Sequence, residues 1–327
     1  MSNHQKWILG IDTSAYTTSV AGVSLDGILL SEIRKTLIVP AGKRGLRQAE
    51  AVFQHIRNIP ENLSELCSRI QALTGDPIPP CAVSVSISPR PYQESYMPVF
   101  VAGSSLARSL AYTCNIPLFE TSHQEGHIQA ALFATGYAPQ QSFLVAHLSG
   151  GTSELLRVLP QVGGFNIEII GKTKDLHAGQ FIDRVGVALG LPFPAGPELE
   201  ILANTCNQQI PKMRNATVGA DFHFSGPETQ LQRWIASGME ASRVARAAEE
   251  SIAITISKAL HYSIELTGIT DIIFVGGVTA NRYLRNRLNQ ELARAFPACQ
   301  LRWASPDLSG DNAVGVALLG KQAMGQF

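Results

Sequence analysis

The sequence predicts an α/β fold built from two domains. Runs of β-forming residues alternate with long helical stretches, which is typical of layered α/β proteins. A plan of three strands, with a polar turn after the first, occurs twice, starting at Trp7 and at Phe143. The chain has 327 residues, of which 45% are hydrophobic. It is therefore long enough for about two domains of roughly 150 residues, each with its own core, and we expect an internal duplication.

The first domain is expected over residues 1–120. Trp7–Ile11 is an apolar run that ends in the polar turn Asp12-Thr13-Ser14. The elements expected next are strands over Thr18–Val23 and Gly27–Ile33, a helix over Gln48–Leu73 interrupted by Pro60, a strand over Ala82–Ile87, a loop over Ser88–Pro98 and a helix over Val99–Thr113.

The second domain is expected over residues 121–304, and residues 305–327 are expected to complete the first. Its strands are predicted over Phe143–Leu148, Thr152–Leu159, Phe165–Gly171, Asp271–Val275 and Leu301–Trp303. Helices are predicted over Asp183–Leu189, Glu198–Asn207, Glu240–Leu266, Asn281–Phe296 and Asn312–Met324. Because no Ser/Gly linker separates the domains, we expect them to share a cleft.

Charge and composition exclude several classes of protein. Lys+Arg 26 balances Asp+Glu 26, whereas a protein that binds nucleic acid alone is usually basic, so contact with RNA is expected through a local patch or partners. No apolar run approaches the ~20 residues of a membrane span. The five cysteines are too scattered for CxxC motifs or a disulfide framework. We expect a cytoplasmic protein without membrane association.

His123 and His127 are the first candidates for chemistry. Four residues apart, they share a helix face and can hold one metal ion, although a surface pair has the same spacing. A zinc protease needs a glutamate directly after the first histidine, and that position is Gln124. Glu125 lies about 200° around the helix from each histidine, away from their shared face. Protease chemistry is therefore disfavoured.

Asp311 precedes the last predicted helix, within Ser309-Gly310-Asp311-Asn312. An aspartate at this point is either the N-cap of the helix or a third, oxygen ligand for a metal ion.

Two glycine pairs lie at strand ends. In Ser149-Gly150-Gly151, the glycines let backbone N–H groups approach a phosphate, although an ordinary hairpin turn has the same composition. Gly276-Gly277 lies between a buried strand and a helix, where α/β folds bind ligands, and Thr279 is a candidate N-cap for that helix. Neither pair matches G-x-G-x-x-G, so a dinucleotide site is not supported.

Asp183 is a candidate to accept hydrogen bonds from a ribose, or else belongs to a surface ion pair. Two basic clusters are candidates to meet RNA phosphates, although solvated faces have the same pattern. They are Lys43, Arg44 and Arg47 in an expected loop, and Arg282, Arg285 and Arg287 on an expected helix.

Taken in order, these motifs resemble the TsaD family from Gly10 to about Gly320. The resemblance implies the actin-like ATPase (ASKHA) fold, with two duplicated domains around a central nucleotide and metal cleft. It implies transfer of a threonylcarbamoyl group from threonylcarbamoyl-AMP to the N6 amine of the adenosine beside the anticodon in tRNA. It also implies one iron or zinc ion and TsaB-like and TsaE-like partners.

The resemblance assigns site residues position by position. His123 and His127 match the family's H-x-x-x-H, and Asp311 matches its late metal-binding aspartate. The nucleotide ligand, threonylcarbamoyl-AMP or ATP/AMP, is implied at His147, Leu148, Ser149, Gly150, Gly151, Asp183, Gly196 and Asn281. The family's D-F-S-F-S-G matches Asp221–Gly226. No residue is assigned to proton transfer.

The chain departs from the family pattern near its start. The opening G-I-E-T-S-C-D-E-T reads G-I-D-T-S-A-Y-T-T over Gly10–Thr18, so Tyr16 and Thr17 replace an acidic pair that lies near the transfer site in the family. Further departures are Thr152, Gln180 and Ser88–Pro91. They indicate a divergent paralogue. Two alternatives therefore stay open: a related carbamoyl-type transferase with another acceptor, and a non-catalytic nucleotide-binding scaffold paired with a true TsaD.

Overall fold

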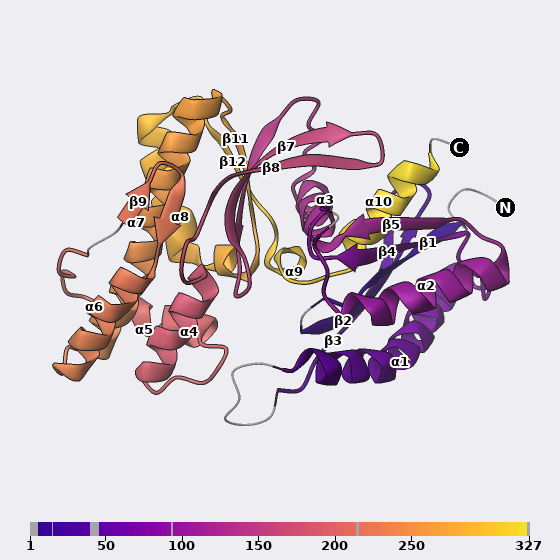
Figure 1. Cartoon of the computed structure of the whole chain (residues 1–327), viewed down its shortest axis with the longest axis horizontal. Coiled ribbons are helices and arrows are strands. Elements are labelled where there is room, and N and C mark those ends of the chain that lie inside the picture. The colour runs from indigo at the N-terminus through magenta and orange to yellow at the C-terminus, as the bar shows by residue number, and fades with distance from the viewer. Residues whose placement is uncertain (1–5, 15, 40–45, 93, 214–215, 326–327) are drawn as a thin grey trace. The chain divides into compact units, whose positions relative to one another are not determined.

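The computed structural model describes residues 6–14, 16–39, 46–92, 94–213 and 216–325 (Figure 1). The chain forms two compact units. Unit 1 contains Met1–Tyr137, Pro160–Asn166 and Gly310–Phe327, and unit 2 contains Ala138–Leu159 and Ile167–Ser309. The expected domain limits at residues 120 and 305 stay predictions. Among the described residues, no helix is both long and apolar enough to cross a membrane.

A five-stranded sheet forms the centre of unit 1, in the order β3-β2-β1-β4-β5. Its strands are β1 (Trp7–Asp12), β2 (Thr17–Ser24), β3 (Leu29–Thr36), β4 (Ala82–Ser88) and β5 (Leu118–Ser122). The first three strands form an antiparallel meander, and β4 and β5 run parallel to β1. The predicted meander is confirmed, whereas the sequence did not predict β5.

Helices cover both faces of this sheet. They are α1 (Gln48–Thr74), α2 (Phe100–Cys114), α3 (His123–Thr135) and α10 (Val314–Met324). In Figure 1, α1 and α2 lie on one face, and α10 lies on the other with α3 beside it. The expected interruption at Pro60 is wrong, because α1 continues through it. Pro60 lies on the exposed side of α1, where water can hydrate the Ile56 carbonyl that the missing N–H leaves unpaired.

Glycines allow the last helix to lie directly against its neighbours. A Cβ on Gly315 of α10 would lie only 1.8 Å from the Gly126 carbonyl oxygen of α3. A Cβ on Gly10 of β1 would lie 2.5 Å from the Ala313 carbonyl oxygen. Only glycine permits backbones to approach this closely. The contact brings the chain just before α10 next to the first turn of α3.

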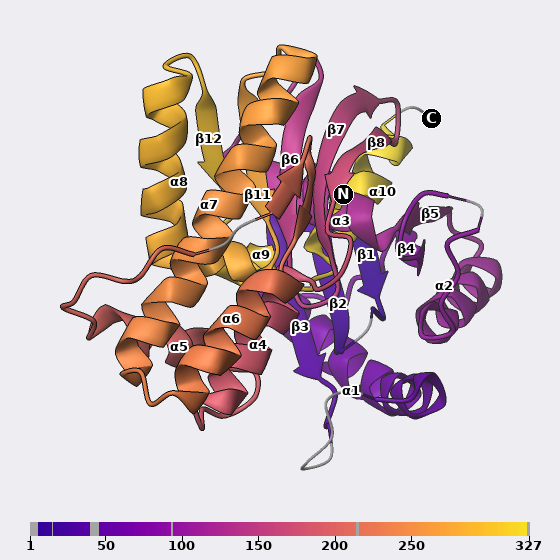
Figure 2. The ribbon, with the colours of Figure 1, turned by 60° about the vertical axis from the view of Figure 1, so that its left-hand side comes forward.

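Unit 2 repeats the strand plan of unit 1, in the order β12-β11-β6-β7-β8 (Figure 2). Its strands are β6 (Phe143–Leu148), β7 (Ser153–Gln161), β8 (Gly164–Lys172), β11 (Asp271–Val275) and β12 (Gln300–Trp303), with β9 (Ala216–Val218) and β10 (Asp221–His223) as a separate pair. As in unit 1, the first strand pairs antiparallel with the second and parallel with a later one. The expected duplication is confirmed.

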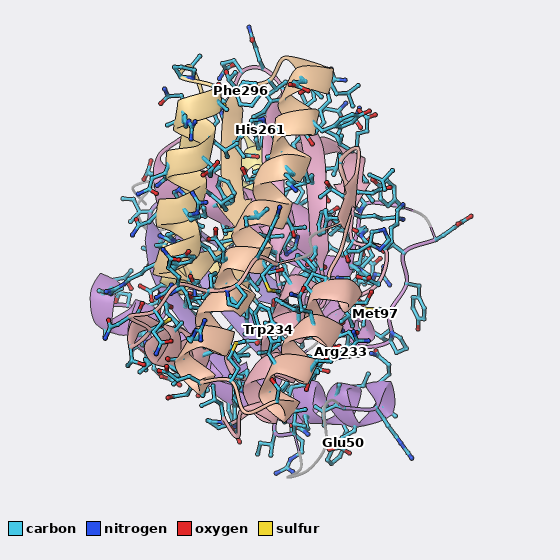
Figure 3. The ribbon with its side chains drawn as sticks, turned by 90° about the vertical axis from the view of Figure 1, so that its left-hand side faces the viewer. Glu50, Met97, Arg233, Trp234, His261 and Phe296 are labelled. Atoms are coloured by element: carbon cyan, nitrogen blue, oxygen red, sulfur yellow. The ribbon has the colours of Figure 1, made fainter. Side chains whose placement is uncertain are left out.

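The helices of unit 2 surround a core centred on the long α7. They are α4 (Ala178–Ala188), α5 (Gly196–Asn204), α6 (Ser225–Ala236), α7 (Ala241–Thr267), α8 (Arg282–Ala295) and the short α9 (Pro306–Ser309), with a 3-10 turn, η2, over Gly277–Ala280. Buried alanine and isoleucine side chains of α7 pack in this core. Figure 3 shows His261 of α7 beside Phe296 at the end of α8, with ring centroids 4.7 Å apart.

Candidate metal centre and nucleotide site

A capping box fixes the start of α3, and with it the two histidines. The Ser122 hydroxyl accepts the N–H of Glu125 at 3.2 Å, and the Glu125 carboxylate accepts the N–H of Ser122 at 2.9 Å. This reciprocal pair makes His123 the first residue of the helix and places His127 one turn later. Because Glu125 is held in the cap, its carboxylate is directed away from the histidine face, as expected.

Asp311 reaches the same point from the turn before α10. The N-cap of α10 is Ala313, and the side-chain oxygen of Asn312, rather than that of Asp311, accepts the N–H of Val314 at 3.0 Å. The Ser19 hydroxyl accepts the N–H of Ala313 at 2.8 Å and ties the turn to β2. The Asp311 carboxylate is thereby directed to the histidines.

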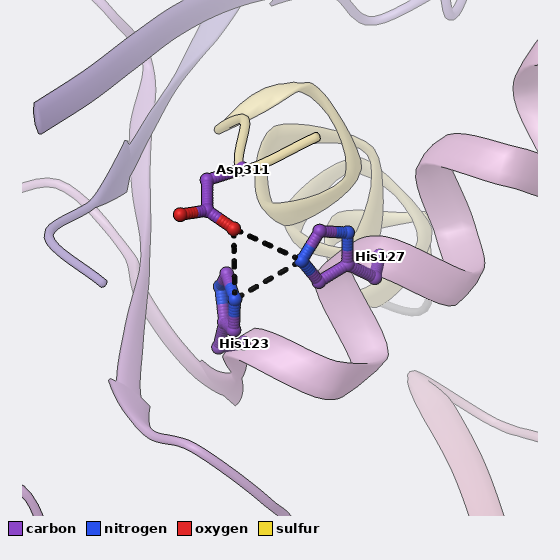
Figure 4. A group of neighbouring side chains, drawn as sticks. All are labelled: His123, His127 and Asp311. Atoms are coloured by element: carbon purple, nitrogen blue, oxygen red, sulfur yellow. Dashed lines mark hydrogen bonds and ion pairs between the residues drawn. The ribbon is translucent and has the colours of Figure 1, made fainter. Parts of the chain in front are cut away.

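The three side chains converge in unit 1 (Figure 4). The Nε2 atoms of His123 and His127 are 3.0 Å apart. The Asp311 Oδ1 atom lies 3.5 Å from the first and 3.4 Å from the second. His127 is buried, and His123 and Asp311 are partly exposed.

These donors fit one divalent ion. In a tetrahedral zinc site with bonds of about 2.0–2.1 Å, donor atoms lie about 3.4 Å apart, close to the 3.0–3.5 Å separations here. Two imidazole nitrogens and a carboxylate oxygen suit zinc and iron equally. Three protein ligands leave coordination positions for a substrate, which is the arrangement of catalytic rather than structural sites.

The carboxylates control where protons lie in the cluster. Burial alone would lower the pKa of His123, but Asp12 and Asp311 outweigh it and raise the pKa to about 10. The pKa of His127 is lowered, first by burial and then by the charge of His123. Burial would raise the pKa of Asp311, but hydrogen bonds from both histidines hold it well below its usual range. The carboxylates therefore favour the protonated form of His123, and a metal ion bound at its Nε2 atom would displace the proton there.

Asp12 is a fourth member of this centre that the sequence did not single out. It is the last residue of β1 and is fully buried, with Oδ1 3.1 Å from His123 Nδ1. Its position as the first polar residue after an apolar strand was the available signal.

The predicted phosphate turn forms in unit 2 between β6 and β7. The Ser149 hydroxyl accepts the N–H of Thr152 at 3.0 Å and that of Gly151 at 3.3 Å, which closes the turn. A Cβ on Gly179, near the start of α4, would lie 2.7 Å from the Gly150 backbone nitrogen. The N-terminus of α4 therefore lies directly on the turn. Its N–H groups are engaged, since that of Ala178 donates to the Ser153 hydroxyl and that of Gly179 to the Ser149 carbonyl, so the helix would favour an anion through its dipole.

His147 and Leu148 precede the turn on β6. Their side chains are 4% and 1% exposed, and Leu148 is part of the unit 2 core. They position the turn, and any contact of Leu148 with a ligand would involve its backbone.

Asp183 and Gly196 are linked through the loop between α4 and α5. Asp183 Oδ1 accepts the N–H of Ala195 at 2.8 Å, directly before Gly196, the first residue of α5. Burial raises the pKa of Asp183. Its second carboxylate oxygen could accept a hydrogen bond from a hydroxyl group.

Asn281 has a structural role in the second glycine turn. Its Oδ1 accepts the N–H of Leu284 at 2.9 Å, so Asn281 is the N-cap of α8, and the assignment of that cap to Thr279 is wrong. The Thr279 hydroxyl instead donates to the Gly276 carbonyl at 2.8 Å. Asn281 Nδ2 donates to Glu249 Oε1 at 2.6 Å.

Glu249 is the second residue that the sequence did not single out. It is 1% exposed on α7 and also pairs with Arg246. Burial raises the pKa of Glu249 to about 7, and Asn281 and Arg246 only partly offset this. A charged residue in the middle of an otherwise small and apolar helix face was its signal.

Two further motifs form hydrogen bonds within unit 2. Asp175 accepts the N–H groups of Phe224 and Ser225, so the segment that matches D-F-S-F-S-G is held at the start of α6. Arg285 donates to the carbonyls of Thr279 and Ala304.

The structure describes the basic cluster on α8, but only part of the cluster at Lys43, Arg44 and Arg47. Arg287 pairs with Glu250 and Glu291, so Arg285 and Arg287 are engaged inside unit 2. Lys43 and Arg44 lie outside the described residues.

The two repeated sheets define an actin-like ATPase fold, and unit 1 carries a His-His-Asp cluster. Comparisons with solved structures agree with the fold. The full-length HypF structure in its phosphate- and nucleotide-bound form is similar with a TM-score of 0.62 and 15% identity, over 98% of this chain and 47% of HypF. The (R)-2-hydroxyglutaryl-CoA dehydratase component A of Acidaminococcus fermentans gives 0.57 and 14%, over 97% and 99%. A ROK family glucokinase of Streptomyces griseus with glucose and AMPPNP gives 0.54 and 11%, over 96% and 98%.

At these identities the solved structures show the fold alone, and the chain spans about half the length of HypF. The family model described as "TsaD: tRNA N6-adenosine threonylcarbamoyltransferase" matches residues 95–318, which is more than half of the chain. The chain therefore belongs to the TsaD family, a family of transferases.

Proposed function

We propose that this protein transfers a threonylcarbamoyl group from threonylcarbamoyl-AMP to the N6 amine of the adenosine beside the anticodon in tRNA. The convergence of His123, His127 and Asp311, in a chain of the TsaD family, is the observation that supports it best. A scaffold without activity would not need three donor atoms within 4.8 Å of one another.

The nucleotide part of the donor would bind in unit 2. Positions for a Cβ on Gly150, Gly151, Gly196 and Gly277 are all open, with nothing within 4 Å. A ligand can therefore lie against the backbone at each of these glycines. The turn at Ser149–Gly151 and the N-terminus of α4 would bind the phosphate, Asp183 a ribose hydroxyl, and the turn capped by Asn281 the rest of the nucleotide.

His123, His127 and Asp311 would hold one iron or zinc ion. When bound, such an ion polarises a carbonyl group and stabilises the charge that develops on its oxygen. In the transfer, the adenosine amine attacks the carbamoyl carbon, the new C–N bond forms, and the bond to the phosphate oxygen of AMP breaks. AMP leaves with the bonding electrons, and the amine loses a proton.

No carboxylate stands at positions 16 and 17 to accept that proton. Tyr16 is 43% exposed, and Thr17 is the first residue of β2. We therefore assign the proton to a phosphate oxygen of the leaving AMP, which becomes a stronger base as its bond to the carbamoyl carbon breaks, rather than to a side chain.

Partners of the TsaB and TsaE kind would supply RNA-binding surface. The chain has no net charge, and affinity for RNA depends on neutralising phosphates. The reaction would take place in a complex with such partners, in the cytoplasm.

The test is mass spectrometry of tRNA nucleosides after incubation with the purified protein, its partners and threonylcarbamoyl-AMP. The wild type is expected to form threonylcarbamoyladenosine. The His123→Ala protein is expected to form at least about 100-fold less, because loss of several kcal/mol of transition-state stabilisation has that effect on a rate. Equal product from both proteins would refute the role of the metal centre.

A second candidate is transfer of the same group to a different acceptor. Tyr16 and Thr17 favour it, because they alter the family pattern beside the transfer site while the metal-binding positions are kept. In the same experiment, this candidate predicts that the wild type consumes threonylcarbamoyl-AMP, that His123→Ala does not, and that the tRNA stays unmodified in both. A protein that leaves the donor intact and binds no metal ion would instead be the scaffold.

A further inference from the structure

We propose that Asp12 is a positioning residue of the metal centre, which orients the His123 ring so that its Nε2 atom faces His127 and Asp311. The proposal rests on the proposed metal site and goes beyond its three ligands.

The contacts of Asp12 fix its carboxylate tightly. Oδ1 lies 3.1 Å from His123 Nδ1 and also accepts the Ser86 hydroxyl, and Oδ2 accepts the Ser14 hydroxyl at 2.6 Å. Asp12 is 0% exposed. The strand beneath it is held on both sides, since Asp12 pairs with Ser19 of β2 and Ile11 pairs with Val85 of β4.

This geometry excludes Asp12 as a direct ligand and gives it another role. Both of its oxygens are occupied, and they lie at the Nδ1 side of the ring, whereas the other ligands lie at Nε2. A neutral imidazole carries its proton on one nitrogen and presents a lone pair on the other. By accepting the Nδ1 proton, Asp12 leaves the Nε2 lone pair for the metal ion and makes that nitrogen a stronger donor.

The alternative is an ion pair that contributes only to folding. In that case, removal of the Asp12 charge would lower stability without changing the metal affinity of the folded protein. The two roles are therefore separated by measuring metal affinity and stability on the same variants.

The experiment compares the wild type, Asp12→Asn and Glu125→Gln in titrations with Co²⁺ and Zn²⁺, against a competing chelator and without tRNA or donor. Glu125→Gln is the matched control, because, like Asp12→Asn, it removes a buried carboxylate charge near the histidines, here from the first turn of α3, and it keeps a capping oxygen. Asp12→Asn is expected to weaken metal binding about 10–100-fold, and Glu125→Gln to leave it within about threefold. Thermal unfolding in excess chelator checks that each variant is folded.

A second readout uses the wild type alone. In the zinc-loaded protein, ¹⁵N NMR of the histidine rings is expected to show His123 protonated at Nδ1. Affinity of folded Asp12→Asn equal to that of the wild type would overturn the positioning role while leaving the metal site intact. A proton on Nε2 would overturn the positioning role and the assignment of Nε2 as a ligand, because a protonated nitrogen has no lone pair for the metal ion. A wild type that binds neither ion would overturn both proposals.

Discussion

His55 shows how burial controls one residue close to the metal centre. It lies fully buried on α1, with Nδ1 2.9 Å from the Thr18 hydroxyl. Within the described residues, its Nε2 has no hydrogen-bond partner. Burial lowers its pKa to about 4, although the charges of Asp12 and Asp311 act in the opposite direction. The folded protein therefore keeps His55 neutral.

This residue predicts a pH dependence of stability. The unfolded chain binds a proton at His55 below about pH 6.5, and the folded chain does so only near pH 4. Stability is therefore fully present above pH 6.5 and declines as the pH falls through this window. Between pH 7.5 and 5, the wild type is expected to lose about 2 kcal/mol more than His55→Asn.

Asparagine is chosen because its side-chain oxygen can replace Nδ1 as the partner of Thr18. Urea unfolding at the two pH values measures the difference. Identical losses for both proteins would show that His55 is not held neutral by the fold.

At the scale of elements, caps and close contacts place the site. The capping box at Ser122 sets the start of α3, and the contact between Gly126 and Gly315 brings α10 against it. In unit 2, Asn281 begins α8 and holds Glu249 at the same time.

The double role of Asn281 can be separated by two substitutions. Asn281→Ala removes the cap, worth about 1 kcal/mol, and leaves the buried Glu249 short of a donor, which costs about 1–3 kcal/mol more. Asn281→Ser keeps a capping oxygen and loses only the amide, so it is expected to recover about 1 kcal/mol. Chemical denaturation of the three proteins at pH 7.5 gives these differences. Equal stability of the serine and alanine variants would contradict the cap.

Periodicity and polarity predicted most elements, because their apolar faces are continuous. They did not predict β5, whose sequence Leu118–Ser122 is short, half polar and at the edge of its sheet. The histidine pair and Asp311 could be predicted from spacing and resemblance. Asp12 and Glu249 stand out in the sequence only as polar residues in apolar surroundings, and their roles could not be predicted, since these depend on partners 111 and 32 residues away.

At the scale of the whole molecule, one strand plan is used twice. Unit 1 has the order β3-β2-β1-β4-β5, and unit 2 has the equivalent order β8-β7-β6-β11-β12. The copies have diverged in chemistry. The cluster at His123, His127 and Asp311 lies in unit 1, and the proposed nucleotide-binding turns lie in unit 2.

The most direct test of the account follows the carbonyl carbon from donor to acceptor. Threonylcarbamoyl-AMP labelled with ¹³C at the carbamoyl carbon is incubated with the protein, its partners and tRNA, and the nucleosides are analysed by mass spectrometry. A tRNA with guanosine in place of the adenosine beside the anticodon is the control, since it lacks the N6 amine. The account predicts label in threonylcarbamoyladenosine from the normal tRNA and none in the control. Consumption of the donor with no label in either tRNA would contradict it.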